Sequence, residues 1–318
     1  MIFSSKIISP LVGISLRNIK MKRAKKSSHG DYTDFLTAIR TFECSIDPLD
    51  ADYYDQHYDD QQAVTYQQVE SPGRVIRSKS GAPLVSTTSI KDYFIKLGVD
   101  KFYIRGSGDP AMFRTMQYAV MNYLGFVGYQ FSEHDLWDLG YYTHYDSNGL
   151  PMYYSDVDVS NWANGVRDKI MEFPEGKIHV TDVNTWRGTF TGKHGINSFE
   201  DVINPDKQEF IALDHFDNKY QNIVLQLAEH GEKLSNYLGK TVRWSECQPV
   251  LTPPDGRPND VEITLSGLLA GAHLRGAEGV VALLINHENH ADENGTAILQ
   301  YVYDFGGYST PYAGSAAD

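Results

Sequence analysis

The sequence of 318 residues contains only two cysteines, Cys44 and Cys247, and no apolar run near the roughly 20 residues that a membrane-spanning helix requires. Two cysteines cannot form a disulfide framework or a cysteine-based metal site. Internal repeats and low-complexity tracts are also lacking. We therefore predict a globular chain without a transmembrane segment, a metal site or a cofactor, whose length suits one large domain or two ordinary ones.

Positive charge is scarce outside the N-terminal segment. Residues 1–30, the basic arm, hold seven basic and no acidic side chains, whereas the rest of the chain holds 21 basic and 41 acidic ones. Nucleic-acid phosphates are bound by clustered cations, so this acidic remainder excludes broad nucleic-acid binding. The basic arm itself is expected to bind an anionic surface or a protein partner.

The basic arm does not follow the pattern of a secretory signal peptide. Its apolar run, "IISPLVGISL", is interrupted by Pro10, and its main charge cluster, "KMKRAKK", follows that run instead of preceding it. We expect a flexible or docking extension on a chain that is synthesised in the cytoplasm without a clear signal peptide. A non-standard targeting role is the alternative.

Helical signals dominate the rest of the sequence. Residues 33–45 carry apolar side chains at helical spacing, namely Phe35, Leu36, Ile39 and Phe42. In "GDPAMFRTMQYAVMNYLG", Asp109 is a candidate N-cap and Gly125 a candidate stop, while Ser132 is the N-cap of the next helix. The pattern predicts helices near residues 33–44, 110–124, 205–228, 264–274 and 296–304.

Two stretches interrupt these helical signals. Residues 46–108 contain the turn signals "SPGR" and "KSGAP" and are expected to be irregular or to contain strands, and residues 141–203 are rich in turn residues. The predicted fold is mainly α (α+β). We expect one domain over residues 31–312 with insertions near 46–108 and 141–203, followed by a tail at 313–318.

An acidic residue falls on the apolar stripe of the first predicted helix. Glu43 lies four residues after Ile39 and seven after Leu36, so the three side chains share one helical face. A buried carboxyl has a raised pKa and can serve as a general acid near neutral pH. The alternative is that the helix ends at Glu43 and the side chain reaches solvent.

Five segments carry a resemblance to a known group of proteins. In chain order they are "FLTAIRTFECS", "LGFVGYQFSEHDLWDLGYY", "WRGTFTGKHGINSFEDVINPDKQEF", "SGLLAGAHLRGAEGVVALL" and "ADENGTAILQYVYDFGGY". Together they resemble the lysozyme-like, lytic-transglycosylase-like proteins of phages and contractile injection systems. The resemblance covers most of residues 33–310 and implies a lysozyme-like fold.

The resemblance also implies roles for particular residues. Glu43 matches the catalytic acid, with Cys44 where serine is usual. The cleft segment is matched by Gly125, Gly128, Tyr129 and Gln130, of which Tyr129 and Gln130 would orient the substrate and Gln130 would face Glu43. The later helix is matched by Ala272, His273, Leu274 and Gly276, with Arg275 where glycine is usual, and would line the cleft.

Cleavage of a β-1,4 link between amino sugars requires a proton donor to the leaving oxygen, and a hydrolase also needs a second carboxylate. A lytic transglycosylase does not need one, because the 6-hydroxyl of muramic acid closes the ring. Asp52 is the leading second carboxylate, nine residues after Glu43, and the other candidates are Asp47, Asp50 and Asp55. These aspartates equally suit a solvated loop.

Aromatic side chains are abundant in the irregular stretches. Amphipathic rings there are expected either to stack on sugars or to pack on the core; they are Tyr53, Tyr54, Tyr58, Tyr141, Tyr142, Tyr145, Tyr153 and Tyr154.

Two acidic or histidine-rich motifs fail as metal sites. "DVDVSN", at residues 156–161, lacks the glycine and the glutamate of a calcium loop. "NHENH", at residues 286–290, is not HExxH and has no third ligand.

The sequence thus predicts a peptidoglycan glycan-strand cleaving enzyme, either a muramidase or a lytic transglycosylase, that acts at the cell wall or periplasm after delivery by a virion or an injection apparatus. The main alternative is a catalytically inactive structural or glycan-binding component with the same fold. A toxin with an unrelated activity on this scaffold is a third interpretation, since fold does not fix function.

Overall fold

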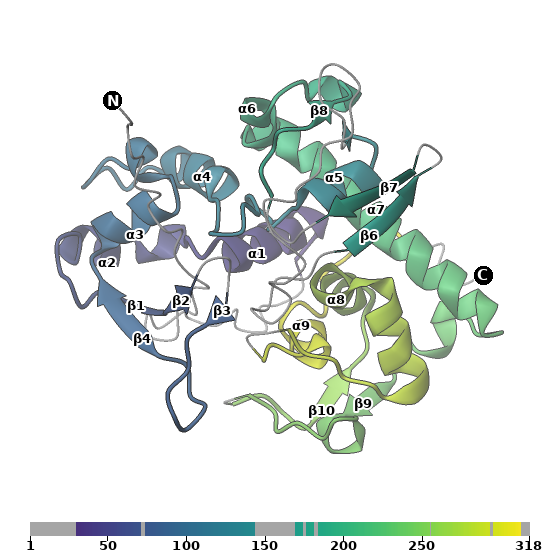
Figure 1. Cartoon of the computed structure of the whole chain (residues 1–318). Helices are drawn as coiled ribbons and strands as arrows, with labels where there is room; N and C mark the ends of the chain where they lie inside the picture. The colour runs from purple at the N-terminus through teal and green to yellow at the C-terminus, as the bar shows by residue number, and fades with distance from the viewer. Residues whose placement is uncertain are drawn as a thin grey trace. The chain divides into compact units, whose positions relative to one another are not determined.

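The structure is a computed structural model, which describes residues 30–70, 74–143, 169–173, 176–180, 184–254, 256–292 and 295–312 (Figure 1). Within these ranges the chain forms helices and short antiparallel strands, so its structure is an α+β mixture. Residues 1–29 of the basic arm, the tail at 313–318 and part of the predicted insertion near 141–203 lie outside the described residues.

The α-helices are α1 (Tyr32–Cys44), α2 (Ala51–Gln56), α3 (Ile90–Lys96), α4 (Pro110–Ala119), α5 (Glu133–Asp138), α6 (Phe199–Val202), α7 (Pro205–Glu229), α8 (Leu265–Asn286) and α9 (Ile298–Asp304). Five antiparallel pairs of strands accompany them in the described part: β1 (Val64–Gln67) with β4 (Val85–Thr88), β2 (Val69–Glu70) with β3 (Arg74–Val75), β5 (Tyr142–Thr143) with β8 (Thr189–Phe190), β6 (Lys169–Phe173) with β7 (Gly176–Val180), and β9 (Thr241–Arg243) with β10 (Asp260–Glu262).

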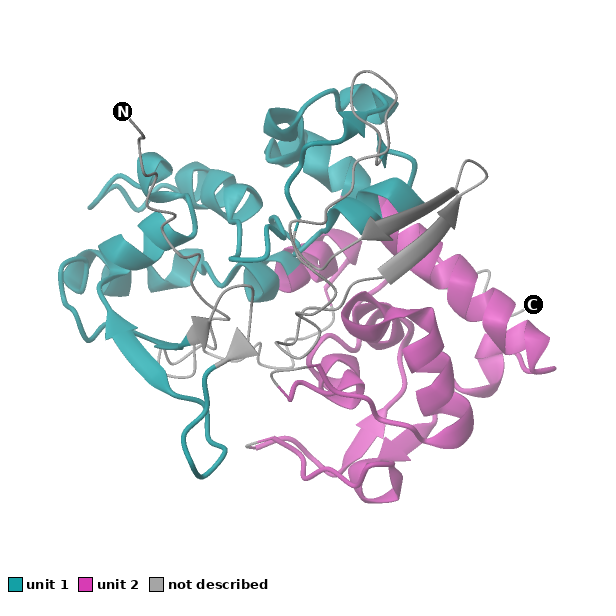
Figure 2. Cartoon of the chain, viewed as in Figure 1, with its two compact units in different colours: residues 1–21, 40–211 teal, residues 22–39, 212–318 magenta. Residues whose placement is uncertain are grey.

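The chain divides into two compact units (Figure 2). Unit 1 comprises residues 1–21 and 40–211, and unit 2 comprises residues 22–39 and 212–318. The boundaries fall inside α1 and α7, so each of these helices contributes to both units. Because compact units that share helices can belong to one domain, the predicted domain over residues 31–312 stays a prediction.

Unit 1 has its own aromatic and aliphatic core. Tyr54 of α2 packs edge-to-face on Phe94 of α3, with ring centroids 5.4 Å apart, and Phe113 of α4 lies 6.0 Å from Tyr54. All three side chains are buried. α2 and α3 lie in the stretch near 46–108 that was expected to be irregular or β. That expectation missed them because helices of six and seven residues are too short to display a clear period.

The end of α4 differs from its prediction, whereas its start is confirmed. The Asp109 side chain accepts the N–H of Ala111, and Pro110 is the first residue of the helix. The helix ends at Ala119, not near residue 124, because Val120 turns to an extended conformation with ψ 131°. Gly125 is therefore part of the following loop and is not the helix stop.

Unit 2 is built around α8, against which α9 packs. α8 begins at the N-cap Thr264, whose side chain accepts the N–H of Gly267. It is interrupted at Arg275 and Gly276, where Gly276 has a φ of 72°. The interruption lies directly after the helix that the sequence predicts near 264–274.

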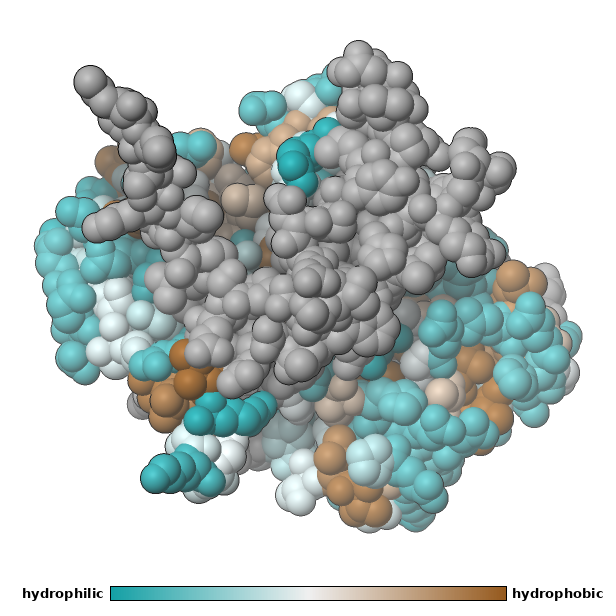
Figure 3. Space-filling model, in the orientation of Figure 1, coloured by the Kyte–Doolittle hydropathy of each residue, from teal (hydrophilic) through white to brown (hydrophobic). Residues whose placement is uncertain are grey.

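One helix of the described residues, α8, has the length and hydropathy of a membrane span, and 61% of its most apolar 18-residue window is buried inside the protein. Core helices share this property. On the face shown in Figure 3, the hydrophobic residues of the described surface form separate patches among hydrophilic ones. The strong transmembrane signal that several exposed apolar helices would give is thus not found in the described part of the chain.

Candidate active site

Glu43 lies in the last turn of α1 and is half-buried. Phe35, Leu36 and Ile39, the preceding residues of the predicted apolar stripe, are buried. Ser45 adopts a left-handed conformation with a φ of 58°, which ends the helix directly after Glu43 and Cys44. Glu43 therefore follows the buried stripe and yet keeps exposed surface at the end of the helix, so its position combines both sequence-based alternatives.

Cys44, the neighbour of Glu43, is a buried thiol. Its Sγ accepts the N–H of Ile46 at 3.4 Å, which helps to hold the chain as it leaves the helix. Burial raises the pKa of the Cys44 thiol to about 12. Since the nucleophilic form of cysteine is the thiolate, the raised pKa disfavours a nucleophilic role, and the contact to Ile46 gives Cys44 a structural role beside Glu43.

The loop of residues 120–131 carries the predicted substrate-binding residues Gly128, Tyr129 and Gln130. Asn122 organises it: its Oδ1 accepts the N–H groups of Leu124 and Phe126 at 2.9 and 3.1 Å. Its Nδ2 donates to Oε1 of Gln130 at 2.6 Å. Gln130 has a φ of 62° and is half-buried, and the two N–H donors of its carboxamide are not used by Asn122.

Position 128 requires a glycine, because the backbone there lies in close contact with the Gln208 side chain. The φ of Gly128 is 56°, and a Cβ built on it would lie 1.9 Å from Oε1 of Gln208 on α7. The same Gln208 side chain donates from Nε2 to the carbonyl oxygens of Tyr118 and Val202 at 3.1 and 2.8 Å. A glycine at position 128 thus allows the loop to lie directly on a buried side chain of unit 1.

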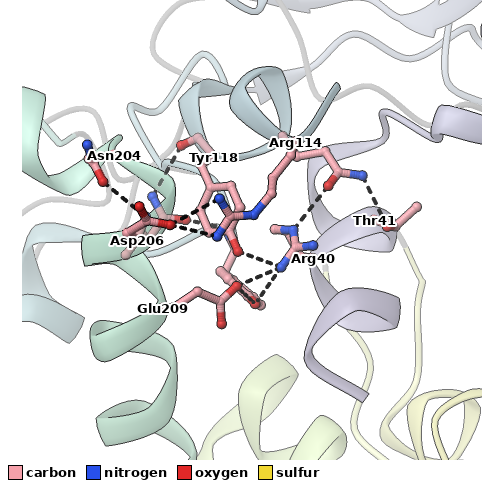
Figure 4. A network of polar contacts seen from close by, with 10 residues as sticks. Arg40, Thr41, Arg114, Tyr118, Asn204, Asp206 and Glu209 are labelled. Atoms are coloured by element: carbon pink, nitrogen blue, oxygen red, sulfur yellow. Dashed lines mark hydrogen bonds and ion pairs between the residues drawn. The ribbon is translucent and has the colours of Figure 1, made fainter. Parts of the chain in front are cut away.

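A buried arginine connects α1 to this loop (Figure 4). Arg40, one turn before Glu43, has only 6% of its surface exposed. Its Nε donates to Oε1 of Gln117 at 3.1 Å. One terminal nitrogen donates to the hydroxyl oxygens of Tyr118 and Tyr129 at 2.6 and 3.1 Å and to Oε1 of Glu209 at 2.7 Å.

The carboxylate of Glu209 balances the charge of Arg40. It also accepts the hydroxyl proton of Tyr129 at 3.0 Å, and 26% of its side chain is exposed. Burial raises the pKa of the Glu209 carboxyl, while the positive charges of Arg40 and Arg114 oppose that shift. Buried charges persist when they are paired and hydrogen-bonded, which both partners achieve here.

Gln117 of α4 holds the chain on both sides of Glu43. Besides accepting from Arg40, its Nε2 donates to Oγ1 of Thr41 at 3.2 Å and to the carbonyl oxygen of Ile46 at 2.8 Å. We call Arg40, Gln117, Tyr129 and Glu209 the Arg40 clamp. It fixes the turn that carries Glu43 to α4, to α7 and to the loop that carries Gln130.

The structure also places the other predicted site residues of unit 1, namely Tyr129, Asp52 and several tyrosines. The Tyr129 side chain has no exposed surface and uses its hydroxyl on Arg40 and Glu209, so a sugar cannot contact its ring in this structure. Asp52 is exposed in the first turn of α2. Of the predicted tyrosines in the described part, Tyr54, Tyr141 and Tyr142 belong to the core.

The predicted residues of the later helix belong to unit 2. Ala272 is fully buried, and Gly276 lies at the interruption of α8. His273 is half-buried, and its Nδ1 lies 3.0 Å from Nε2 of His215 on α7. Burial lowers the pKa of His215 well below its usual value, with Lys219 and His273 contributing in the same direction.

Sequence reasoning missed Arg40, Gln117 and Glu209. The position of Arg40 could have indicated a buried polar contact. It lies four residues after Leu36 on the apolar face of the helix, where a cation without a partner would not be tolerated. Glu209 is 169 residues from Arg40 along the chain, and no local pattern points to it.

Within the described ranges, no group of three or more His, Cys, Asp or Glu side chains could hold a metal ion. In "NHENH", His290 and Glu288 form an exposed pair at 3.1 Å, while "DVDVSN" lies outside the described residues.

Comparison with models of known protein families, with curated proteins and with solved structures finds no match to this chain.

Proposed function

We propose that this chain cleaves the glycan strands of peptidoglycan, as a muramidase or a lytic transglycosylase, with Glu43 as the general acid. The observation that supports this most is the Arg40 clamp. It ties the turn with the half-buried Glu43 to the loop with Gln130 through Arg40 and the Tyr129 hydroxyl. Acid catalysis requires a proton donor that is held in position, and the clamp holds the chain on both sides of Glu43 and directly before Gln130.

The chemistry needs one proton donor at the glycosidic bond. Glu43 would protonate the leaving oxygen while the sugar ring becomes oxocarbenium-like. The carboxamide of Gln130 offers two N–H donors toward hydroxyl or N-acetyl oxygens of the sugar. Cys44, as a buried thiol with a raised pKa, leaves the proton transfer to Glu43.

The second carboxylate decides between the two reactions. Asp52 is exposed and lies on α2, a separate helix from Glu43, and a muramidase would use it on the opposite face of the sugar. A lytic transglycosylase would leave it without a role, because the 6-hydroxyl of muramic acid closes the ring. A reducing muramic acid end therefore calls for a second carboxylate, with Asp52 as the leading candidate, whereas an anhydro end calls for none.

The proposal is tested with purified parent, Glu43→Gln and Glu229→Gln on isolated peptidoglycan, with released fragments identified by mass spectrometry. Glu43→Gln keeps the shape but removes the transferable proton, so we expect cleavage to fall by about a hundred- to ten-thousand-fold. Glu229 is exposed at the last residue of α7, and its change should leave cleavage at the parental rate. Equal cleavage by all three proteins would rule out Glu43 as the acid.

A catalytically inactive, glycan-binding component is the second candidate. The full burial of Tyr129 and Ala272 favours it, because two predicted substrate contacts have structural roles instead. In this case a folded parent protein would bind peptidoglycan in a sedimentation assay and would release no fragments. For either function, we propose that the chain meets its substrate at the cell wall after delivery by a virion or an injection apparatus.

A further inference from the structure

We propose that Arg40 and Tyr129 are positioning residues for Glu43, which set the placement of its carboxyl relative to the Gln130 loop. This inference rests on the proposed function and concerns the same site. Arg40 makes two kinds of contact. Some join α1 to α4, and others extend to the loop of residues 120–131.

The contacts to α4 support the helix itself. Gln117 and Tyr118 are neighbours near the end of α4, and both accept hydrogen bonds from Arg40. The guanidinium also lies over the Tyr118 ring, 4.5 Å from its centroid. These contacts fix α1 against α4, and Tyr118 meets the loop only through its ring, which lies edge-on to the Tyr129 ring with centroids 6.1 Å apart.

The contacts to Tyr129 and Glu209 do extend to the loop. The Tyr129 hydroxyl accepts from Arg40 at 3.1 Å and donates to Glu209 at 3.0 Å, so it bridges the two charges. Tyr129 immediately precedes Gln130, which has a left-handed φ of 62°. Removal of this one hydroxyl would break the link from the loop to Arg40 and Glu209 while the contacts of Arg40 to α4 remain.

Two tyrosine variants therefore separate positioning from stability. Tyr118→Phe and Tyr129→Phe each remove one buried hydroxyl that accepts from the same nitrogen of Arg40. The Tyr118 bond is shorter, 2.6 Å against 3.1 Å, so a purely structural role predicts that Tyr118→Phe is at least as damaging. A positioning role predicts the opposite order for kcat, because the Tyr129 hydroxyl belongs to the loop itself, whereas the Tyr118 hydroxyl belongs to α4.

The experiment measures kcat and KM on peptidoglycan, well below the melting temperature of each protein, for parent, Tyr129→Phe, Tyr118→Phe, Arg40→Lys and Arg257→Lys. A displacement of about 1 Å at a catalytic group can cost about 100-fold. We therefore expect Tyr129→Phe and Arg40→Lys to lower kcat by about 10- to 100-fold with little change in KM, and Tyr118→Phe to lower it less. Arg257 forms a similarly buried ion pair in unit 2, and its variant should keep the parental kcat.

Three outcomes are informative. The expected order supports the positioning role. An active parent whose kcat is equally affected by Tyr118→Phe and Tyr129→Phe, or unaffected by Arg40→Lys, overturns the positioning role while the proposed function stands. A folded parent without any cleavage overturns the proposed function, and the positioning role with it.

Discussion

Two buried arginines use their charge in different ways. In unit 2, Arg257 meets Asp304 at the end of α9 through two nitrogens and both carboxylate oxygens, with side chains only 7% and 10% exposed. In unit 1, Arg40 divides its donors among a carboxamide, two phenols and a carboxylate, and Glu209 is 26% exposed. The first arrangement closes on itself and joins two segments, whereas the second extends from a helix into a loop.

The difference separates stability from function. A closed bidentate pair holds both partners in one geometry and contributes to a fixed tertiary contact. A dispersed set of donors couples several elements, so that a change at one of them is felt at the others. We expect unit 2 to lose mainly stability when its arginine pair is broken, and the Arg40 region to lose mainly catalysis when Tyr129 is altered.

The largest expected effect on stability comes from Asp304→Ala. Removal of one partner leaves Arg257 buried without its carboxylate, and such changes cost about 3–5 kcal/mol of folding free energy. Urea unfolding measures the loss, and amide hydrogen exchange should show more opening in α9 than in α4. Asp260→Ala is the matched control, because it breaks an ion pair with Arg243 whose side chains are more than half exposed, and it should change the midpoint little. Equal effects of the two variants would contradict the comparison.

A fall in pH is expected to have an intermediate effect on the folding stability of unit 2. His215 is buried with a pKa well below its usual value, so the folded state keeps it neutral while the unfolded state binds a proton below about pH 6.5. Stability is therefore retained above that pH and lost as the pH falls, by up to about 1.4 kcal/mol per pH unit for one group.

Urea unfolding at several pH values between 7.5 and 5.5 measures this slope. His215→Gln can still hydrogen-bond to His273 but does not titrate, so it should flatten the slope relative to the parent protein. An unchanged slope in that variant would show that other groups cause the pH dependence.

The smallest expected effect concerns the start of α4, the helix that carries Gln117. Asp109→Ala removes the side-chain acceptor for the Ala111 N–H and should cost about 1 kcal/mol, as helix N-caps do. Asp109→Asn keeps an acceptor and should cost much less. Thermal unfolding of the two variants would resolve the order, and a larger loss in Asp109→Asn would argue against the cap as the cause.

Local signals predicted the parts of the fold that local forces determine. The cap at Asp109 and Pro110 and the capping box at Ser132 were readable, because each acts within three residues. The end of α4 was not, since Val120 leaves the helix for a loop that is held by Asn122 and by Gln208, 79 residues away from Tyr129.

The candidate site shows the same limit. The helical stripe points to Glu43 from neighbouring residues alone, and its role as the acid is what the resemblance to lysozyme-like proteins implies. The clamp around it joins Arg40 to Gln117 and Glu209, and pairings across such separations have no signature in a single sequence. The predicted facing of Glu43 and Gln130 stays a prediction.

The long sequence separations within the Arg40 clamp also bear on when the site forms during synthesis. The first partner, Gln117, follows Arg40 by 77 residues and the last, Glu209, by 169. A ribosome makes Glu43 early, yet the carboxylate that neutralises its neighbour Arg40 emerges only after two thirds of the chain. Any product that stops before residue 209 consequently carries the proposed acid without its complete support, and premature termination yields a fragment whose clamp cannot close.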